Sequence, residues 1–321
     1  MKAFAYVTPQ SPESAVELVR DDGRFYAGGV DLLGEMKEFL ATPRTLVNVK
    51  ALPGSGEIGF DAAQCTVGAN VTVADLAAHP RIIGALPGLA LAAAEVGSPQ
   101  IRNMATVGGN LAQHSRCWYY RHRDVHCRKK GGAKCFARTG EAKYHSLFTG
   151  CMCVSPAVSN LAVALAALDA RVCVLRGRGV DKLTVEELYA SAWTNPLAHN
   201  SLGPADLILR VEIPIPAGGR STYMQVSEKS DFDWALVSCA ASALVSGRSV
   251  SRVRIVLGAV APVPWQVAEA NQLLEGRTLD DGLAGKAADR ILRDATPLEG
   301  NGYKLPIARA LIRRSLQKLV A

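Results

Sequence analysis

Apolar and polar positions in the first hundred residues alternate between strand-like and helical periods. The opening strand-like run is followed by Ser11 and Pro12, which predict a helix start with its cap and first-turn proline. The next helical pattern turns an apolar face inward, made up of Leu32, Leu33, Met36, Phe39 and Leu40. The runs that follow predict a strand at 45–52, a hairpin at 57–69 and a helix capped by Thr72. This mixture predicts an α+β fold.

The longest apolar stretch, residues 85–97, is too short and too interrupted to cross a bilayer. It contains Pro87, Gly88 and Glu95, so the pattern predicts a buried helix. The N-terminal MKAFAYVTPQ lacks an apolar run of signal-peptide length. We therefore expect no membrane span and a cytoplasmic location, or a periplasmic one if a partner subunit carries the export signal.

The pattern divides the chain into two domains with an insertion in the first. A helix and a strand resume after residue 153, so the stretch at about 114–153 interrupts one fold. The strand at 205–216 ends in two prolines and is followed by AGG, which is typical of a boundary. We predict domains at 1–216 and 218–321, the second being a smaller α+β unit that ends in a basic amphipathic helix.

The eight cysteines fall into two groups. Cys65, Cys173 and Cys239 lie in apolar contexts that predict buried, inert thiols. The other five lie between residues 117 and 153, a clustering that core packing does not require. Without a secretory signal, this arrangement favours a metal site or reduced thiols over a disulfide framework.

The spacing of the clustered cysteines differs from that of common metal motifs. The steps from Cys117 to Cys127, Cys135 and Cys153 are ten, eight and eighteen residues, and Cys151 competes for the last position. Zinc ribbons and ferredoxins use tighter pairs. A metal cage here would have to be folded from loops.

The net charge of +7 is concentrated beside these cysteines. Residues 116–145 hold nine Lys or Arg against two acidic residues, so the rest of the chain is neutral. A 4Fe-4S cluster with four thiolates is anionic, and nearby cations stabilise it. The alternative is a zinc-containing nucleic-acid module that uses Trp118, Tyr119 and Tyr120 as a stacking platform. We favour packing around a cluster for these aromatics, and solvent-facing roles for the nearby His114, His122, His126 and His145.

Two glycine pairs are candidates for binding an anion. They lie in AGGVDLL at 27–33 and in TVGGN at 106–110. Glycine permits sharp turns and close approach of backbone N–H groups to a phosphate. Neither pair fits GxGxxG or a P-loop, so each alone also suits an ordinary strand-to-helix turn.

Together with SNLAVALAALDA and ILRVEIPIP, these glycine motifs resemble the FAD-binding medium subunit of the xanthine dehydrogenase, or molybdenum hydroxylase, family. The resemblance covers nearly the whole chain. It implies a two-part FAD-binding domain of the PCMH/vanillyl-alcohol-oxidase type, followed by a C-terminal domain of the CO dehydrogenase flavoprotein type. The cysteine-rich segment resembles the 4Fe-4S insertion of a subset, the 4-hydroxybenzoyl-CoA reductase β subunit and the aldehyde oxidoreductase FAD subunit.

The resemblance also implies roles for particular residues. The strand near Leu209 would lie along the flavin, and Asn160 stands where the family usually has an aspartate that binds the ribose region. Counting back from Ser159 favours Cys153 over Cys151, so the implied cluster ligands are Cys117, Cys127, Cys135 and Cys153. The residues implied at the FAD pyrophosphate are Ala27, Gly28, Gly29, Val30, Asp31, Leu32, Leu33, Thr106, Gly109 and Asn110.

We therefore expect an electron-transfer subunit without a catalytic acid or base of its own. The resemblance implies a large subunit with the molybdenum cofactor and a small one with 2Fe-2S clusters. A ferredoxin-linked aromatic acyl-CoA reductase is the alternative within the family to an aldehyde or N-heterocycle oxidase. Surface lysines such as Lys129 and Lys130 would steer an acidic carrier such as a ferredoxin rather than nucleic acid.

Overall fold

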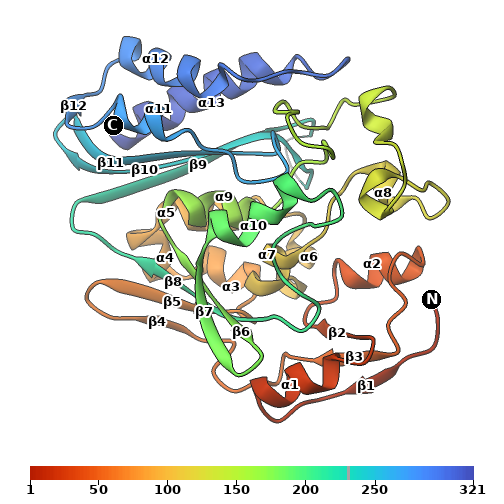
Figure 1. Ribbon diagram of the computed structural model, residues 1–321. Helices are drawn as coiled ribbons and strands as arrows, with labels where there is room; N and C mark the ends of the chain where they lie inside the picture. Colours follow the sequence, from red (N-terminus) through yellow and green to blue (C-terminus); the bar gives the residue numbers. More distant parts are fainter. Residues whose placement is uncertain (230–231) are drawn as a thin grey trace.

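The computed structural model describes residues 1–229 and 232–321, and these residues form three β-sheets. The first two sheets lie in the lower part of Figure 1 and the third lies in the upper part. The cysteine-rich segment, residues 114–153, runs along one flank between α2 and the C-terminal helices (Figure 1).

The N-terminal sheet is parallel, with strand order β1-β3-β2. Helix α1 packs on it through Ala15, Val16 and Val19. The helix begins as predicted, because the Ser11 hydroxyl accepts from the Ser14 backbone N–H at 3.2 Å and the Ser14 hydroxyl accepts from the Ser11 N–H at 3.1 Å. The elements are β1 (Ala5–Val7), α1 (Pro12–Val19), β2 (Gly23–Tyr26), α2 (Leu32–Lys37) and β3 (Thr45–Asn48).

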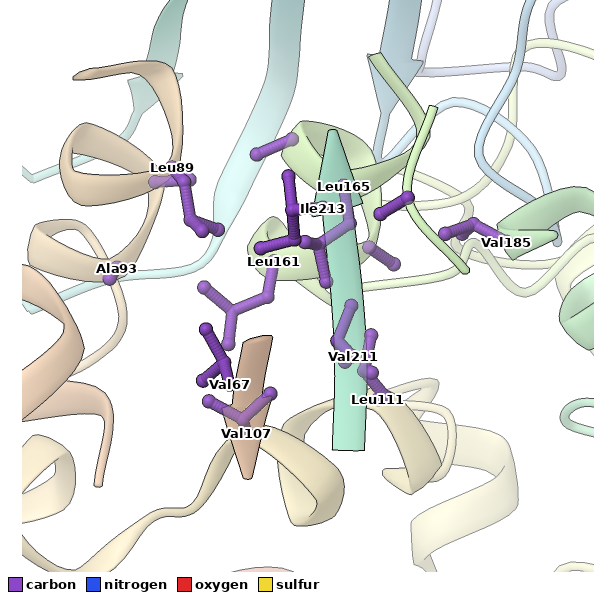
Figure 2. Packing of buried hydrophobic residues seen from close by; sticks show 14 of the residues in the cluster. Val67, Leu89, Ala93, Val107, Leu111, Leu161, Leu165, Val185, Val211 and Ile213 are labelled. Carbon is purple, nitrogen blue, oxygen red and sulfur yellow. The ribbon is translucent and has the colours of Figure 1, made fainter. Parts of the chain in front are cut away.

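The second sheet is antiparallel, in the order β4-β5-β8-β6-β7. Its inner face packs on α5, α7 and α9, where Val67, Val211 and Ile213 meet Leu161 and Leu165 (Figure 2). The strands are β4 (Ile58–Phe60), β5 (Gln64–Gly68), β6 (Arg171–Arg176), β7 (Gly179–Thr184) and β8 (Leu207–Pro214). The helices are α3 (Val73–Ala78), α4 (Pro80–Ala85), α5 (Pro87–Ala94), α6 (Pro99–Met104), α7 (Val107–Ala112), α9 (Asn160–Ala167) and α10 (Val185–Thr194).

The third sheet is antiparallel, with order β12-β11-β10-β9. Helices α12 and α13 cover one face, and α5 and α9 lie against the other, which joins this sheet to the second core (Figure 1). Its elements are β9 (Gly219–Ser227), β10 (Ala235–Ser246), β11 (Ser249–Gly258), α11 (Ala268–Gln272), β12 (Arg277–Thr278), α12 (Asp281–Leu292) and α13 (Lys304–Leu319).

The cysteine-rich segment contains little regular structure and is fastened to the third sheet. It forms α8 (Trp118–Arg121) and the 3-10 turns η1 (Arg128–Lys130) and η2 (Phe136–Arg138). Backbone N–H groups of Leu147 and Phe148 donate to the Val260 carbonyl at 2.8 and 3.1 Å. Both side chains are buried in the C-terminal core. The segment therefore folds as part of the molecule rather than as a free loop.

Most predicted elements are confirmed, including the hairpin, the Thr72 cap and the buried helix at α5. The predicted inward face of α2 is confirmed at Met36, which is buried, and is wrong at Phe39, while Leu32, Leu33 and Leu40 are half-buried. The helix ends at Lys37, and Phe39 adopts a left-handed φ of 56° with its side chain exposed. The Arg123 guanidinium lies 5.5 Å from the centroid of the Phe39 ring. A contact with the cysteine-rich segment thus replaces burial.

Candidate cofactor-binding site

A cleft of about 1080 Å³ opens between the first two sheets and extends to the edge of the third. Both glycine motifs line it, together with Leu209 of β8 and Asn160 at the start of α9. The volume slightly exceeds the usual range for drug-sized ligands. The cleft therefore suits a larger molecule, such as a dinucleotide.

The two glycine motifs meet at one wall of this cleft. A Cβ on Gly28 would overlap the Met104 carbonyl, which stands just before the second motif, so glycine is required here by chain packing. Gly29 adopts a φ of +71°, which disfavours any other residue. A Cβ on Gly109 would meet only the Thr106 hydroxyl, at 3.0 Å. Of the three, Gly109 is the glycine whose missing side chain leaves room for a ligand.

Eleven of the twelve residues implied at the FAD site line the cleft, and Leu33 does not. The Leu33 backbone N–H is already used, since it donates to the Gly29 carbonyl at 3.0 Å. The eleven are Ala27, Gly28, Gly29, Val30, Asp31, Leu32, Thr106, Gly109, Asn110, Asn160 and Leu209.

Polar contacts around Ser159 fix the side chains deep in the cleft. The Ser159 hydroxyl caps α9 and donates to the Asn110 amide oxygen at 2.6 Å. The Asn160 amide donates to the Gln225 side-chain oxygen on β9 at 3.2 Å. Asparagine at position 160 therefore links the cleft to the third sheet through a neutral hydrogen bond.

Segments that sequence reasoning did not single out also line the cleft. Among them are the turn at 52–59, the loop at 197–204 and residues 232–234. The glycines of the turn were a weak signal, and nothing in the other two marks a binding site. Arg116 and His114, from the cysteine-rich segment, also line the cleft. The cysteine-rich segment thus contributes residues to this cleft as well as the clustered cysteines.

Four of the clustered cysteines surround a small cavity, which Tyr119, Tyr120 and Phe136 also line. These cysteines are Cys117, Cys127, Cys135 and Cys153. Cys151 is not part of the lining, and its thiol donates to the Cys153 carbonyl at 3.2 Å. Within the described residues, no set of three or more His, Cys, Asp or Glu side chains is arranged to hold a metal ion.

Two of these thiols are hydrogen-bonded to each other. A hydrogen bond from Cys153 lowers the pKa of Cys135 to about 6, and the same bond together with burial raises the pKa of Cys153. Burial raises the pKa of Cys117 to about 11, although backbone N–H groups of Tyr120 and Tyr119 oppose this. Backbone donors directed at sulfur favour the thiolate form.

The prediction that Lys129 lies at the surface is wrong. Its exposed fraction is 7%, and its ammonium group donates to the Ala198 carbonyl at 2.7 Å. Burial lowers the pKa of Lys129, while the negative charge that the nearby Cys153, Cys117 and Cys127 carry when ionised would raise it. No carboxylate of the described residues forms an ion pair with it. A buried cation beside four thiols matches an anionic occupant.

The prediction of a solvent-facing histidine is wrong for His145, which has an exposed fraction of 2%. Its Nε2 lies 3.1 Å from the Cys117 sulfur, and burial lowers the pKa of His145 to about 4. His122 and His126 are exposed as predicted. Tyr119 stacks on Phe136 with ring centroids 5.9 Å apart. Tyr119 and Tyr120 thus line the thiol cavity, whereas Trp118 does not.

The remaining cysteines confirm their predicted role. Cys65, Cys173 and Cys239 are fully buried, and burial raises the pKa of Cys65 and Cys239 to about 12. All eight cysteines are free. The core thiols are therefore protonated packing residues.

Known proteins resemble this chain over almost its full length. Residues 2–216 match the family described as "FAD binding domain in molybdopterin dehydrogenase", and residues 221–319 match "CO dehydrogenase flavoprotein C-terminal domain". The aldehyde oxidoreductase FAD-binding subunit PaoB of Escherichia coli (strain K12) is 34% identical, with 96% of each chain covered. The carbon monoxide dehydrogenase medium chain of Hydrogenophaga pseudoflava is 26% identical, covering 98% of this chain and 96% of that one.

Solved structures share the fold. Quinoline 2-oxidoreductase from Pseudomonas putida 86 matches with a TM-score of 0.76 at 24% identity, covering 100% of this chain and 98% of that one. Reconstituted CO dehydrogenase from Oligotropha carboxidovorans matches with a TM-score of 0.78 at 23% identity, covering 99% and 98%.

The fold and the glycine-lined cleft therefore define an FAD-binding oxidoreductase subunit. The chain belongs to the FAD-binding medium subunits of the xanthine dehydrogenase and CO dehydrogenase family. In the described part of the chain, no helix combines the length and apolar character needed to span a bilayer.

Proposed function

We propose that FAD lies in the cleft with its pyrophosphate against the two glycine motifs and its flavin along β8 near Leu209. Supporting this, Gly109 leaves open space in the cleft wall. Arg116 also lines the cleft, and its buried Nε has no hydrogen-bond partner among the described residues. A phosphate oxygen would satisfy that donor. Leu33, which the resemblance included, is left out of the proposed contacts.

We further propose that Cys117, Cys127, Cys135 and Cys153 ligate one 4Fe-4S cluster. The cavity between these four thiols is the observation that carries this proposal. Buried Lys129 would supply the counter-charge that an anionic cluster needs.

In this proposal the chain relays electrons within a larger molybdenum enzyme. Bound FAD supplies exchange of electrons singly or in pairs, which links one-electron clusters to two-electron chemistry. The chain would connect the 2Fe-2S clusters of a small subunit to an external acceptor or donor. Substrate chemistry would take place at the molybdenum cofactor of a large subunit.

The aldehyde oxidoreductase relative, at 34% identity, favours an aldehyde-oxidising complex. The alternative remains a reductase that takes electrons from a ferredoxin toward an aromatic acyl-CoA. Exposed cations at Arg123 and Lys134, rather than Lys129, would meet an acidic carrier. The nucleic-acid alternative is not supported, because Arg116, Arg121 and Lys143 are paired with carboxylates of this chain.

Cofactor analysis of the protein purified without oxygen tests the proposal. We expect one FAD, four iron and four acid-labile sulfide per chain, as the composition of a 4Fe-4S flavoprotein requires. Zinc in place of iron, together with salt-sensitive binding of nucleic acid, would instead support the alternative module.

Replacing Lys129 by methionine should lower the reduction potential of the cluster. A unit charge within a few ångströms at an effective dielectric of about 20 is worth a few kcal/mol, on the order of 100 mV for one electron. Redox titration followed by electron paramagnetic resonance measures the shift. Lys134→Met is the matched control, because Lys134 is exposed and solvent screens its charge. Equal potentials in the two variants would contradict the role of Lys129.

A further inference from the structure

A network of ion pairs joins the cysteine-rich segment to the first glycine motif. The Arg121 guanidinium lies 2.7 Å from the Asp31 carboxylate and 3.6 Å from that of Glu35. The Arg116 guanidinium lies 3.0 Å from Asp31. Asp31 and Glu35 belong to the proposed pyrophosphate loop and the first turn of α2. Both arginines therefore brace this loop from outside its own sheet.

Hydrogen bonds to the same two carboxylates reinforce this junction. The backbone N–H of His114 donates to Asp31 at 2.7 Å, and the Tyr120 hydroxyl donates to Glu35 at 2.9 Å. His114 Nδ1 also lies 2.9 Å from Glu35. Glu35 has an exposed fraction of only 4%, so these contacts replace its hydration.

The charges at this junction affect how an anionic ligand is received. Asp31 lines the cleft, and Glu35 lies in its wall. Burial raises the pKa of Asp31, but the nearby Arg116 and Arg121 lower it by more. The net effect is a lowered pKa, so the Asp31 carboxyl is ionised. Two carboxylates beside a pyrophosphate would repel it. The two arginines cancel that charge before the ligand arrives.

The junction is also connected to the thiol cavity. Cys117 immediately precedes α8, and its carbonyl accepts from the Arg121 backbone N–H at 2.9 Å. The Arg121 Nε donates to the Ser115 carbonyl at 2.7 Å. The position of Cys117 at the cavity therefore sets the position of α8 and of the Arg121 side chain. Arg121 itself does not line the cleft.

We propose that Arg121 is a positioning residue through which occupancy of the cysteine centre and affinity for FAD are coupled. When the four thiols hold their cluster, α8 presents Arg121 to Asp31 and Glu35, and the pyrophosphate loop is set for binding. When the cluster is absent, α8 loses its anchor at Cys117, the ion pairs weaken and the affinity for FAD falls. This inference rests on the proposed function, since it needs both cofactors.

The first test measures the Kd of FAD for the full chain by the quenching of flavin fluorescence. Arg121→Met should weaken binding by about 10-fold, a typical coupling between two sites. Glu35→Gln added to Arg121→Met should recover most of the loss, because it removes one of the two negative charges that Arg121 offsets in the wild-type protein. Arg123→Met is the matched control, since Arg123 is an exposed arginine of the same segment that pairs with Asp124. A Kd for Arg121→Met within 2-fold of the wild-type value would overturn the proposal.

The second test repeats these measurements after iron has been removed by a chelator without oxygen. Removing iron should lower the FAD affinity of the wild-type protein by about 10-fold. The same treatment should lower the FAD affinity of Arg121→Met by less than about 3-fold, relative to Arg121→Met that still holds iron. Equal losses in both proteins would show that coupling does not pass through Arg121. Circular dichroism establishes that Arg121→Met is folded, and Arg121→Lys, which keeps the charge, replaces it if it is not. That variant should bind FAD more weakly than wild type, because a lysine cannot pair with both carboxylates.

The results with wild-type protein distinguish a failure of the proposed coupling from a failure of the proposed function. A wild-type chain that bound no FAD, or that held no iron, would contradict the proposed function. A wild-type chain that held both but bound FAD equally well with and without iron would contradict only the coupling.

Discussion

Gly109→Val is expected to abolish retention of FAD in a chain that remains folded. The structure leaves space toward the cleft at Gly109, where a Cβ would meet only the Thr106 hydroxyl. The branched valine side chain would occupy the place where the pyrophosphate is proposed to approach the backbone. The flavin absorbance of the purified variant, set against its protein concentration, measures retention.

Gly285→Val is the matched control for this substitution. Gly285 is likewise a helical glycine, but it lies in α12 of the C-terminal domain, and a Cβ built there would meet nothing within 4 Å. Both variants carry the modest cost of a β-branched residue in a helix. Full flavin occupancy in Gly109→Val would remove the second glycine motif from the proposed site.

Cys153→Ser is expected to lose the cluster, and Cys151→Ser is expected to keep it. Cys153 lines the thiol cavity with three other cysteines, whereas the Cys151 thiol points to a backbone carbonyl. A serine hydroxyl is a poor replacement for a thiolate ligand to iron, so the loss should be nearly complete. Iron and sulfide analysis of the two variants gives the result.

These two variants control for each other, because both residues are buried and lie two positions apart. A general disturbance of folding would affect both to a similar degree. Retention of iron by Cys153→Ser and its loss from Cys151→Ser would show that Cys151 is the fourth ligand.

Features fixed by neighbouring residues could be predicted from the sequence. The Ser11 cap with Pro12, the Thr72 cap and the 57–69 hairpin depend on residues within a few positions of one another. The apolar contexts of Cys65 and Cys173 likewise predict buried thiols. In each case the contacts are close in sequence, so the pattern contains the information.

The candidate site could be predicted only in part. The two glycine motifs could be recognised in the sequence, and eleven of the twelve implied residues do line one cleft. The contribution of the 197–204 loop to the cleft could not be predicted. It depends on where the fold places this loop and not on its residue types. Leu33 lies outside the cleft because α2 directs it elsewhere.

The sequence by itself determined the local elements, the core thiols and the concentration of positive charge in residues 116–145. Only the tertiary structure decided what each charge does. Lys129 lies inside beside the thiols, while Arg116 and Arg121 pair with Asp31 and Glu35 some ninety residues away. Whether a long basic side chain is hydrated or buried depends on the partner that meets it in space. That partner comes from a distant part of the chain, and no local pattern encodes it.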